Sequence, residues 1–260
     1  NGGGIYNYTS SPTMNNCTFV NNDAKDNGGG MFNINISYPI ISNCTFTSNF
    51  ATNNGGGMYN DYSSPMISKS TFSGNTANNG GGVYNYNTSI DMYNTSISEN
   101  IANTNGGGMY NTAAYPRLNN SIIKENNSNS GGGVYNLNSF PTLINITISE
   151  NIANNGAEWF NQSGVPTIRN SIIWGNGIFG DFNDNQNSLI QGRDSTNDGN
   201  ISGIFDPLFM NPSGGDYRLL PCSPAINAGN NGPFCDQCTD IEGHPRIQEA
   251  TVDMGAYESE

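Results

Sequence analysis

Gly-Gly-Gly-Met-Tyr-Asn, residues 55–60, is one of six copies of a hexapeptide in which three glycines precede Ile, Met or Val, then an aromatic residue, then Asn. The copies recur every 25 to 27 residues, at 2–7, 28–33, 55–60, 80–85, 106–111 and 131–136. A diverged seventh copy, Gly-Ala-Glu-Trp-Phe-Asn, occupies residues 156–161. A fixed period of this length indicates an array of stacked structural units rather than a conventional globule.

A second motif lies about 17 residues after each glycine run, and it reads Phe or Ile, two variable residues, then Asn. Between the two motifs a proline precedes alternating residues, as at 39–43, 65–69 and 141–145. Each repeat thus holds about three short extended segments separated by Gly, Pro, Asn or Ser, with no helical periodicity. Such a unit is typical of a parallel β-helix, in which rungs stack about 4.8 Å apart.

The second motif predicts two ladders along the axis. The first is apolar, is stabilised by burial between rungs, and consists of Phe19, Phe46, Phe72, Ile97, Ile123, Ile148 and Ile173. In the second, side-chain amides tolerate a left-handed turn and bond from rung to rung; it consists of Asn22, Asn49, Asn75, Asn100, Asn126, Asn151 and Asn176. We therefore predict an all-β fold of about seven rungs.

The repeats span residues 1–177. Residues 178–200 are rich in Asn, Asp and Gly, and we interpret them as a long loop or irregular rung. Residues 201–260 do not repeat, and they contain six prolines and three cysteines. An array needs an atypical end over its last apolar layer, so we expect this segment to be an irregular C-terminal cap.

The composition excludes several classes of function. Hydrophobic residues make up 34% and charged residues 11% of the chain, against about 45–50% and 25% in typical domains. Such a composition also fits disorder, but the strict register of the aromatic residues argues against it. Only 8 Lys and Arg oppose 21 Asp and Glu, which gives a net charge of −13, so we expect no binding to nucleic acid or to an anionic membrane. No apolar run is long enough for a membrane span.

The repeat motifs resemble the GGA-I and F-x-x-N repeats of the polymorphic outer-membrane protein family of bacterial surface β-helices, with GGG in place of the preferred GGA. The C-terminal module resembles the tail of secreted bacterial β-helix proteins of the choice-of-anchor type. The matching blocks are DPLF at 206–209, DYRL at 216–219, SPAINAG at 223–229, DIEGHPR at 240–246 and VDMGAYE at 252–258. These resemblances imply a right-handed parallel β-helix, an extracellular or cell-surface location, and an adhesive or structural role.

An enzymatic function is the alternative, because several polysaccharide-cleaving enzymes share this fold. Hydrolysis needs paired carboxylates, and a lyase needs a Lys or Arg base with acidic residues that hold calcium. Asp61 and Asp91 are isolated, and the only histidine, His244, lies in the tail motif, where we expect a structural role. We interpret the recurring glutamates as a solvated edge: Glu99, Glu125 and Glu150. We therefore predict no catalytic residues and no cofactor.

Calcium is the one metal for which the sequence offers candidates. Asp181 and Asp184 lie in an oxygen-rich segment with Asp194 and Asp198, and calcium prefers carboxylate and amide oxygens. The spacing matches no EF-hand or nonapeptide calcium repeat. A solvated loop is the favoured interpretation.

The five cysteines suggest cross-links. Cys17 and Cys44 occupy the same position on adjacent rungs, so their Cα atoms should lie about 4.8 Å apart, inside the range of about 4.4–6.8 Å that a disulfide allows. They are either a disulfide or two buried thiols. In the C-terminal module we expect Cys222 to pair with Cys235 or Cys238, which fits an oxidising compartment.

The residue that precedes Cys17 or Cys44, and its equivalents in the other repeats, form a further column. This column includes Lys69, so we expect it to face water. Four of its asparagines begin Asn-x-Ser/Thr sequons, which makes them candidates for glycosylation: Asn16, Asn43, Asn94 and Asn145.

These observations support three functional hypotheses. The first is a non-catalytic extracellular surface or structural protein, an adhesin or stalk whose flat ladders bind surface glycans or other partners. The second is a subunit that assembles head to tail into filaments, because an uncovered first rung leaves unpaired strand edges. The third is a polysaccharide lyase or glycoside hydrolase on a β-helix scaffold.

Overall fold

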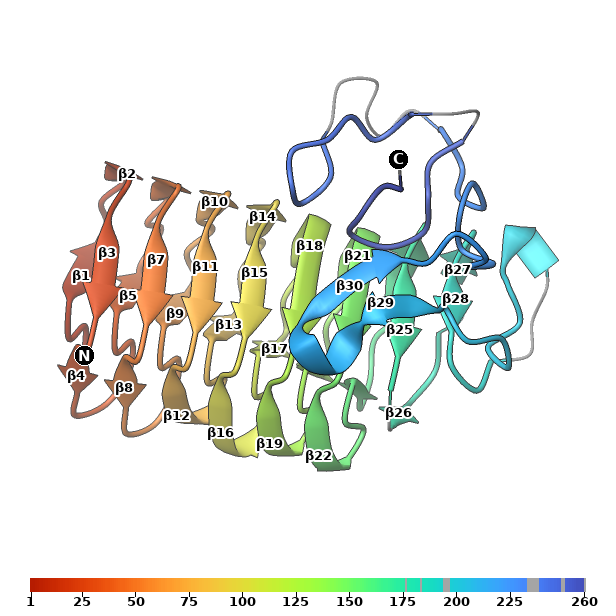
Figure 1. Cartoon of the computed structure of the whole chain (residues 1–260). Helices are drawn as coiled ribbons and strands as arrows, with labels where there is room; N and C mark the ends of the chain where they lie inside the picture. Colours follow the sequence, from red (N-terminus) through yellow and green to blue (C-terminus); the bar gives the residue numbers. More distant parts are fainter. Residues whose placement is uncertain (176, 183, 194–196, 233–238, 249–250, 260) are drawn as a thin grey trace.

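The computed structural model describes residues 1–175, 177–182, 184–193, 197–232, 239–248 and 251–259. It is an all-β structure in which parallel strands stack into a β-solenoid of about seven turns (Figure 1). The predicted parallel β-helix with its spacing of about 25 residues is therefore confirmed. Among the described residues, no helix is long and apolar enough to cross a membrane.

Sheet A contains the strands that follow the glycine runs, and the rungs are numbered 1 to 7 from its first seven strands. In order along the axis these strands are β1 (Ile5–Tyr8), β5 (Met31–Ile34), β9 (Met58–Asp61), β13 (Val83–Tyr86), β17 (Met109–Thr112), β20 (Val134–Leu137) and β23 (Trp159–Asn161), with β26 (Ile178–Phe179) last. Sheet C consists of β4 (Asp23–Ala24), β8 (Phe50–Ala51), β12 (Thr76–Asn79), β16 (Ile101–Asn105), β19 (Asn127–Ser130) and β22 (Ile152–Asn155).

Sheet B is the largest, and most of its rungs contribute two short strands separated by two residues, the first of which forms a corner. The first strands are β2 (Thr13–Asn15), β6 (Ile40–Ser42), β10 (Met66–Ser68), β14 (Asp91–Tyr93), β24 (Thr167–Arg169) and β27 (Asp184–Gln186). The second strands are β3 (Thr18–Val20), β7 (Thr45–Thr47), β11 (Thr71–Ser73), β15 (Ser96–Ser98), β25 (Ile172–Trp174) and β28 (Leu189–Ile190). In rungs 5 and 6 the two merge into β18 (Arg117–Lys124) and β21 (Thr142–Ser149).

The interior contains the predicted ladders. Phe46 stacks on Phe19 and Phe72 with ring centroids 4.5 and 4.6 Å apart. Each described asparagine of the second motif before Asn151 donates its side-chain N–H to the next Oδ1 at 2.7–2.9 Å, and Asn176 lies outside the described residues. A second buried ladder, with bonds of 2.7–2.9 Å, was not predicted; it consists of Asn7, Asn33, Asn60, Asn85, Asn111 and Asn136.

The three glycines of each hexapeptide allow neighbouring rungs to approach closely. Gly28 has a φ of +68°, a conformation that residues with a Cβ rarely adopt. A Cβ on Gly30 would lie 2.6 Å from the carbonyl oxygen of Gly57 and 3.0 Å from the Phe46 ring. The aromatic residues that follow the glycines point outward from sheet A, where their rings stack with centroids 4.5–5.3 Å apart.

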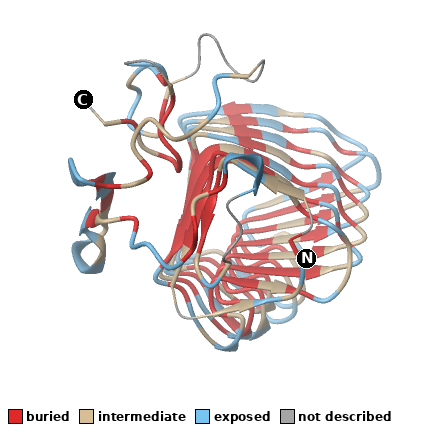
Figure 2. Ribbon diagram, turned by 90° about the vertical axis from the view of Figure 1, so that its right-hand side faces the viewer, coloured by how far each residue is buried: buried red, intermediate tan, exposed pale blue. Residues whose placement is uncertain are grey.

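The solenoid ends in a partial rung, and the C-terminal module lies along its flank. Strands β26, β27 and β28 pair in parallel with rung 7, and Phe182 packs on Trp159 inside the last turn. The 3-10 helix η1 (Asn197–Gly199) follows, and the described residues of 206–232, 239–248 and 251–259 then pack on the outer face of sheet B (Figures 1 and 2). This module contains the antiparallel pair β29 (Phe209–Asn211) and β30 (Asp216–Leu219), with η2 (Pro212–Gly214) between them.

One outward column of sheet B changes character where the module begins. It reads Thr18, Thr45, Thr71 and Ser96 on rungs 1 to 4, then Ile122, Thr147, Ile172 and Leu189. Ile122, Ile172 and Leu189 join a second apolar core with residues of the module, including Tyr217 and Met254. The aliphatic residues of this column are buried by the module, whereas its threonines on rungs 1 to 3 are exposed or half-buried.

Candidate ligand-binding groove

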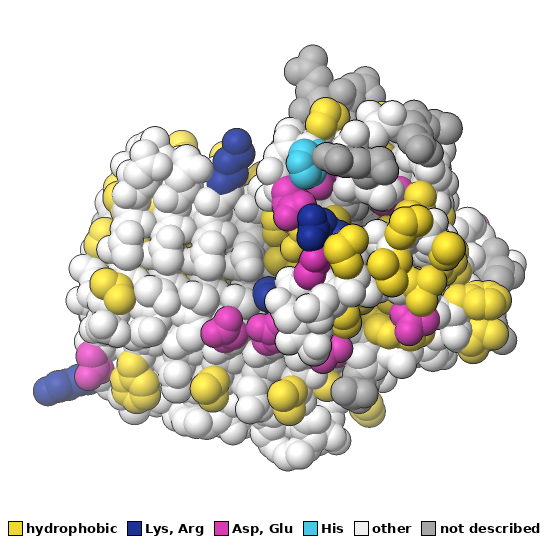
Figure 3. Space-filling model, viewed as in Figure 1, with side chains coloured by type: hydrophobic (Ala, Val, Ile, Leu, Met, Phe, Trp, Pro, Cys, Tyr) yellow, Lys and Arg dark blue, Asp and Glu magenta, His cyan; other side chains and the backbone are white. Residues whose placement is uncertain are grey.

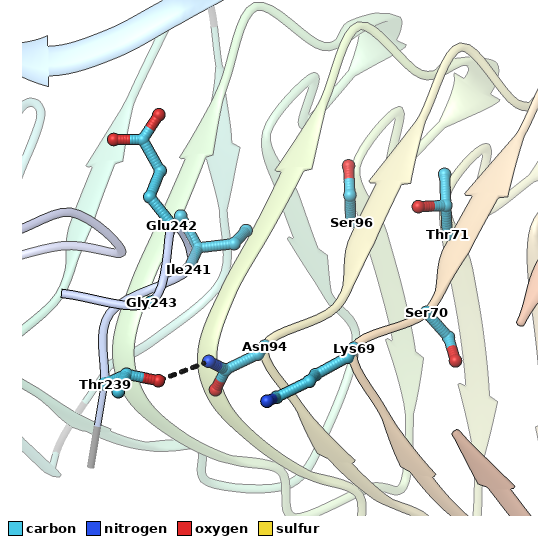
Figure 4. A pocket seen from close by; sticks show the side chains of 9 residues that line it. All are labelled: Lys69, Ser70, Thr71, Asn94, Ser96, Thr239, Ile241, Glu242 and Gly243. Carbon is cyan, nitrogen blue, oxygen red and sulfur yellow. Dashed lines mark hydrogen bonds between the residues drawn. The ribbon is translucent and has the colours of Figure 1, made fainter. Parts of the chain in front are cut away.

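A groove lies where the open face of sheet B meets the C-terminal module. Its volume is about 380 Å³, and Figure 4 shows the side chains that line it. Strands β11 and β15 supply the floor, the corners of rungs 3 and 4 one wall, and the module the other. The lining residues are Lys69, Ser70, Thr71, Asn94, Ser96, Thr239, Ile241, Glu242 and Gly243.

Asn94 joins the two walls of the groove. Its φ of +47° places it at the left-handed corner between β14 and β15. From there its side-chain N–H groups donate to the backbone oxygen of Asp240 at 2.8 Å and to Oγ1 of Thr239 at 3.1 Å. Lys69, one rung earlier, occupies the same corner and is exposed. The groove therefore combines hydroxyls, an amide and one ammonium group with the carboxylate of Glu242.

The turn that forms the module's wall is organised by the buried carboxylate of Asp240. Its Oδ1 accepts the backbone N–H groups of Glu242 and His244 at 2.9 and 2.8 Å, and its Oδ2 accepts that of Glu258 at 3.1 Å. Nδ1 of His244 lies 3.5 Å from the same Oδ2. Asp240, Glu242 and His244 are the one group of described residues close enough together to hold a metal ion. The three N–H bonds already explain the position of Asp240.

A second cavity of about 490 Å³ lies on the other side of this turn, and Glu242 borders both. Its wall includes Glu258, whose pKa burial raises to about 8, although the guanidinium of Arg246 opposes the shift. Arg246 is buried and donates to the backbone oxygens of Asp253 and Gly255 at 2.8 and 3.1 Å. Arg246 therefore holds the backbone of residues 253–255 in place.

The structure contains free thiols where disulfides were candidates. Cys17 and Cys44 are both free, and each thiol donates to a backbone oxygen of its own rung. Cys44 is buried and Cys17 is half-buried, so the alternative of two buried thiols holds for Cys44 alone. The expected pairing of Cys222 is wrong, because Cys222 is a free, exposed thiol. Cys235 and Cys238 lie outside the described residues.

The glycosylation candidates differ in their accessibility. Asn16 and Asn43 are exposed at the corners of rungs 1 and 2. Asn94 bonds to the module, and Asn145 is buried beneath it and donates to Oδ1 of Asn120 at 2.8 Å. The expectation of a column that faces water throughout is therefore wrong beyond rung 3, because the module covers the later corners.

The calcium and carboxylate candidates do not converge in the described part of the chain. Oδ1 of Asp184 lies 2.6 Å from the guanidinium of Arg169, and its Oδ2 accepts the hydroxyl of Thr167 at 2.9 Å. Asp181 is exposed, and Asp194 lies outside the described residues. Asp61 and Asp91 stand on different sheets, and the corner glutamates follow one edge: Glu99, Glu125 and Glu150.

Sequence reasoning did not find the groove, because its two walls are about 150 residues apart in the chain. The change of the outward column from Thr and Ser to Ile at Ile122 was a usable signal, since aliphatic residues on an outer face require a cover. No protein-family model, no curated protein and no solved structure matches this chain. The resemblances of the repeats and the tail to bacterial surface proteins thus stay expectations.

Proposed function

We propose that this chain is a non-catalytic, adhesin-like solenoid of the extracellular or cell-surface space, which binds an uncharged polymer across rungs 1 to 3 of sheet B and into the groove. One observation carries the proposal. A single sheet face is half covered by the chain's own module and half open, and the groove lies at the border. Figure 3 shows the open half as a surface of side chains that are mostly neither hydrophobic nor charged.

The groove fits binding better than it fits cleavage. Its described lining contains one carboxylate, Glu242, and one amine, Lys69. A glycoside hydrolase needs two carboxyl groups on opposite sides of the scissile bond. Asp240 is close by, but it is fully buried and accepts three backbone N–H groups. The lyase or hydrolase alternative therefore has less support.

The charge of the protein favours a neutral ligand. The net charge of −13 repels a polyanion at long range. The open columns of sheet B consist mainly of Ser, Thr and Asn, which offer hydrogen bonds without charge. A neutral polysaccharide and an uncharged extended polypeptide both meet these requirements.

Binding to immobilised neutral polysaccharides and to uncharged unfolded polypeptides tests the proposal, with surface plasmon resonance as the measurement. The variants Thr45→Lys and Thr71→Lys place a long charged side chain on the open face, and we expect each to lose most of the binding. Thr104→Lys is the matched control, because Thr104 is exposed on sheet C. Binding to no polymer, equal binding by all variants, or release of oligosaccharides would each overturn the proposal.

A further inference from the structure

Beside the second apolar core, backbone groups of the module form hydrogen bonds with sheet B. The N–H of Ala256 donates to Oγ1 of Thr147 at 2.9 Å, and the N–H of Gly255 donates to the backbone oxygen of Asn170 at 2.8 Å. The side chain of Asn170 bonds both backbone groups of Asn230, because its Nδ2 donates to the oxygen and its Oδ1 accepts the N–H, each at 3.0 Å. The outer face of the sheet therefore binds polypeptide in this structure.

This geometry recognises an extended backbone. In an extended chain the N–H and the C=O of one residue point to the same side, as they do when two residues of antiparallel strands exchange both bonds. A carboxamide presents a donor beside an acceptor. The side chain of Asn170 therefore bonds the N–H and the C=O of one residue as a neighbouring strand would. A threonine hydroxyl accepts a single N–H in the same way. These bonds need no particular side chain on the bound segment.

Both columns continue onto the open rungs. Thr147 belongs to the column of Thr18, Thr45 and Thr71, which is exposed or half-buried. Asn170 belongs to the corner column that begins with Asn16 and Asn43. These three asparagines have φ values of 48°, 54° and 50°, so each side chain leaves a backbone of the same conformation. The groups that hold the module are thus repeated, without a cover, on rungs 1 and 2.

We propose that rungs 1 to 3 of sheet B bind an extended, uncharged polypeptide segment of a partner protein through the threonine and asparagine columns, as the later rungs hold the chain's own tail. The inference rests on the proposed function and names its ligand class as polypeptide. The interface already formed by the module continues directly into the open surface, which is the ground for choosing this occupant.

Two further features favour a polypeptide and set its character. The outward residues of sheet B on rungs 1 to 3 include no aromatic ring whose face could receive a sugar ring. The aromatic residues of sheet A cover each other's faces in their stack. Lys69 is the one charged residue in the two columns on these rungs, so a segment without charge fits the face. Val20, Ile40 and Met66 are exposed on these rungs but lie outside the two columns. Binding through the threonine and asparagine columns therefore relies on hydrogen bonds.

The experiment uses the full chain labelled with ¹⁵N and with ¹³C in its threonine methyl groups. The probe is an acetylated, amidated octapeptide of alternating serine and threonine, and two comparison probes are the same peptide with alternate backbone nitrogens methylated and the neutral hexasaccharide cellohexaose. We expect the octapeptide to shift the side-chain amide signals of Asn16 and Asn43 and the methyl signal of Thr45. N-methylation should weaken binding about tenfold or more, because it removes several of the backbone N–H donors that the columns would accept.

The double variant Asn43→Gly/Thr45→Val should weaken octapeptide binding by a similar factor, and glycine preserves the left-handed corner. The matched control is Asn138→Gly/Thr104→Val, because Asn138 is exposed with a φ of 50° outside the two columns. Binding of cellohexaose without the octapeptide would overturn this inference and leave the proposed function standing. Equal binding of the methylated peptide, or equal loss in the control, would also overturn it, and binding of no probe would contradict both proposals.

Discussion

Asn151 donates its side-chain N–H to Oε2 of Glu158 at 2.6 Å, so a buried carboxylate ends a ladder of six carboxamides. All the donors of this ladder point toward rung 7, from Asn22 to Asn49 and onward. Aligned hydrogen bonds polarise one another, and the donor end of such a chain favours a negative charge. Glu158 occupies the hexapeptide position that is glycine in the other copies, which explains why its side chain reaches the ladder.

Replacement of Glu158 should therefore destabilise the protein. Glu158→Ala removes the acceptor of the buried backbone N–H of Asn151 and the nearest acceptor of its side-chain amide. We expect a loss of about 1–3 kcal/mol in the free energy of unfolding. Glu158→Gln keeps an acceptor oxygen and should lose less. Urea denaturation followed by circular dichroism measures both, and an alanine variant as stable as the unmodified protein would contradict this account of the ladder.

A substitution inside the asparagine ladder should lower the free energy of unfolding more than a substitution outside it. Asn100 accepts the backbone and side-chain N–H groups of Asn75 and donates to Asn126 and to the backbone oxygen of Phe72. Asn100→Ala orphans several buried groups at once, so we expect a loss of at least about 3 kcal/mol. Asn103→Ala removes an exposed asparagine of the same rung, and its effect should stay within about 0.5 kcal/mol. Chemical denaturation of the two variants is the measurement. Similar losses of stability in both would contradict the prediction.

The third glycine of the hexapeptide should not tolerate a methyl group. A Cβ on Gly82 would lie 2.5 Å from the carbonyl oxygen of Gly108 and 3.1 Å from Nδ2 of Asn100. Neighbouring rungs would have to separate, so Gly82→Ala should lower stability by about 1–3 kcal/mol or more. Gly192→Ala is the control, because nothing lies within 4 Å of its Cβ and only its φ of +74° is strained. Thermal unfolding of the two variants should rank Gly82→Ala as the less stable.

The attachment of the module should weaken at alkaline pH. Burial raises the pKa of Glu258 from 4.5 to about 8, so the folded protein binds this proton more tightly than the unfolded chain does. The resulting stabilisation is complete below about pH 4.5 and is lost as the pH rises through about 8. Glu258→Gln should remove this dependence. Hydrogen exchange of the module between pH 5 and 9, corrected for intrinsic rates, is the measurement, and protection that stays constant in the unmodified protein would contradict the prediction.

The free cysteines should differ in their reactivity. Cys222 is exposed, whereas Cys44 is buried and its thiol pKa is raised by that burial. Because the thiolate is the reactive form, iodoacetamide should label Cys222 in the folded protein and reach Cys44 only after denaturation. Mass spectrometry of the labelled peptides decides the question, and fast labelling of Cys44 in the folded state would show that rung 2 opens.

Much of the solenoid could be predicted because its contacts join equivalent positions of successive repeats. Phe46 lies between Phe19 and Phe72 in space, so the repeat period alone places the three rings together. The same reasoning placed the ladder that contains Asn100. It did not extend to Tyr59 and its neighbours, because three glycines interrupt the alternation of side chains, and the outward direction of these rings emerged only in the structure.

The amino-acid sequence by itself determined the array, its period and its interior ladders, because every rung buries its side chains against a copy of itself. Only the tertiary structure decided where the module lies, which asparagines face water and where the groove forms. These features depend on single contacts between segments about 150 residues apart, such as the bond from Asn94 to the backbone of Asp240. Asn170 makes a similar bond to a different segment of the module, at Asn230. The partners of these contacts do not repeat with the rungs, so no periodic signal records them.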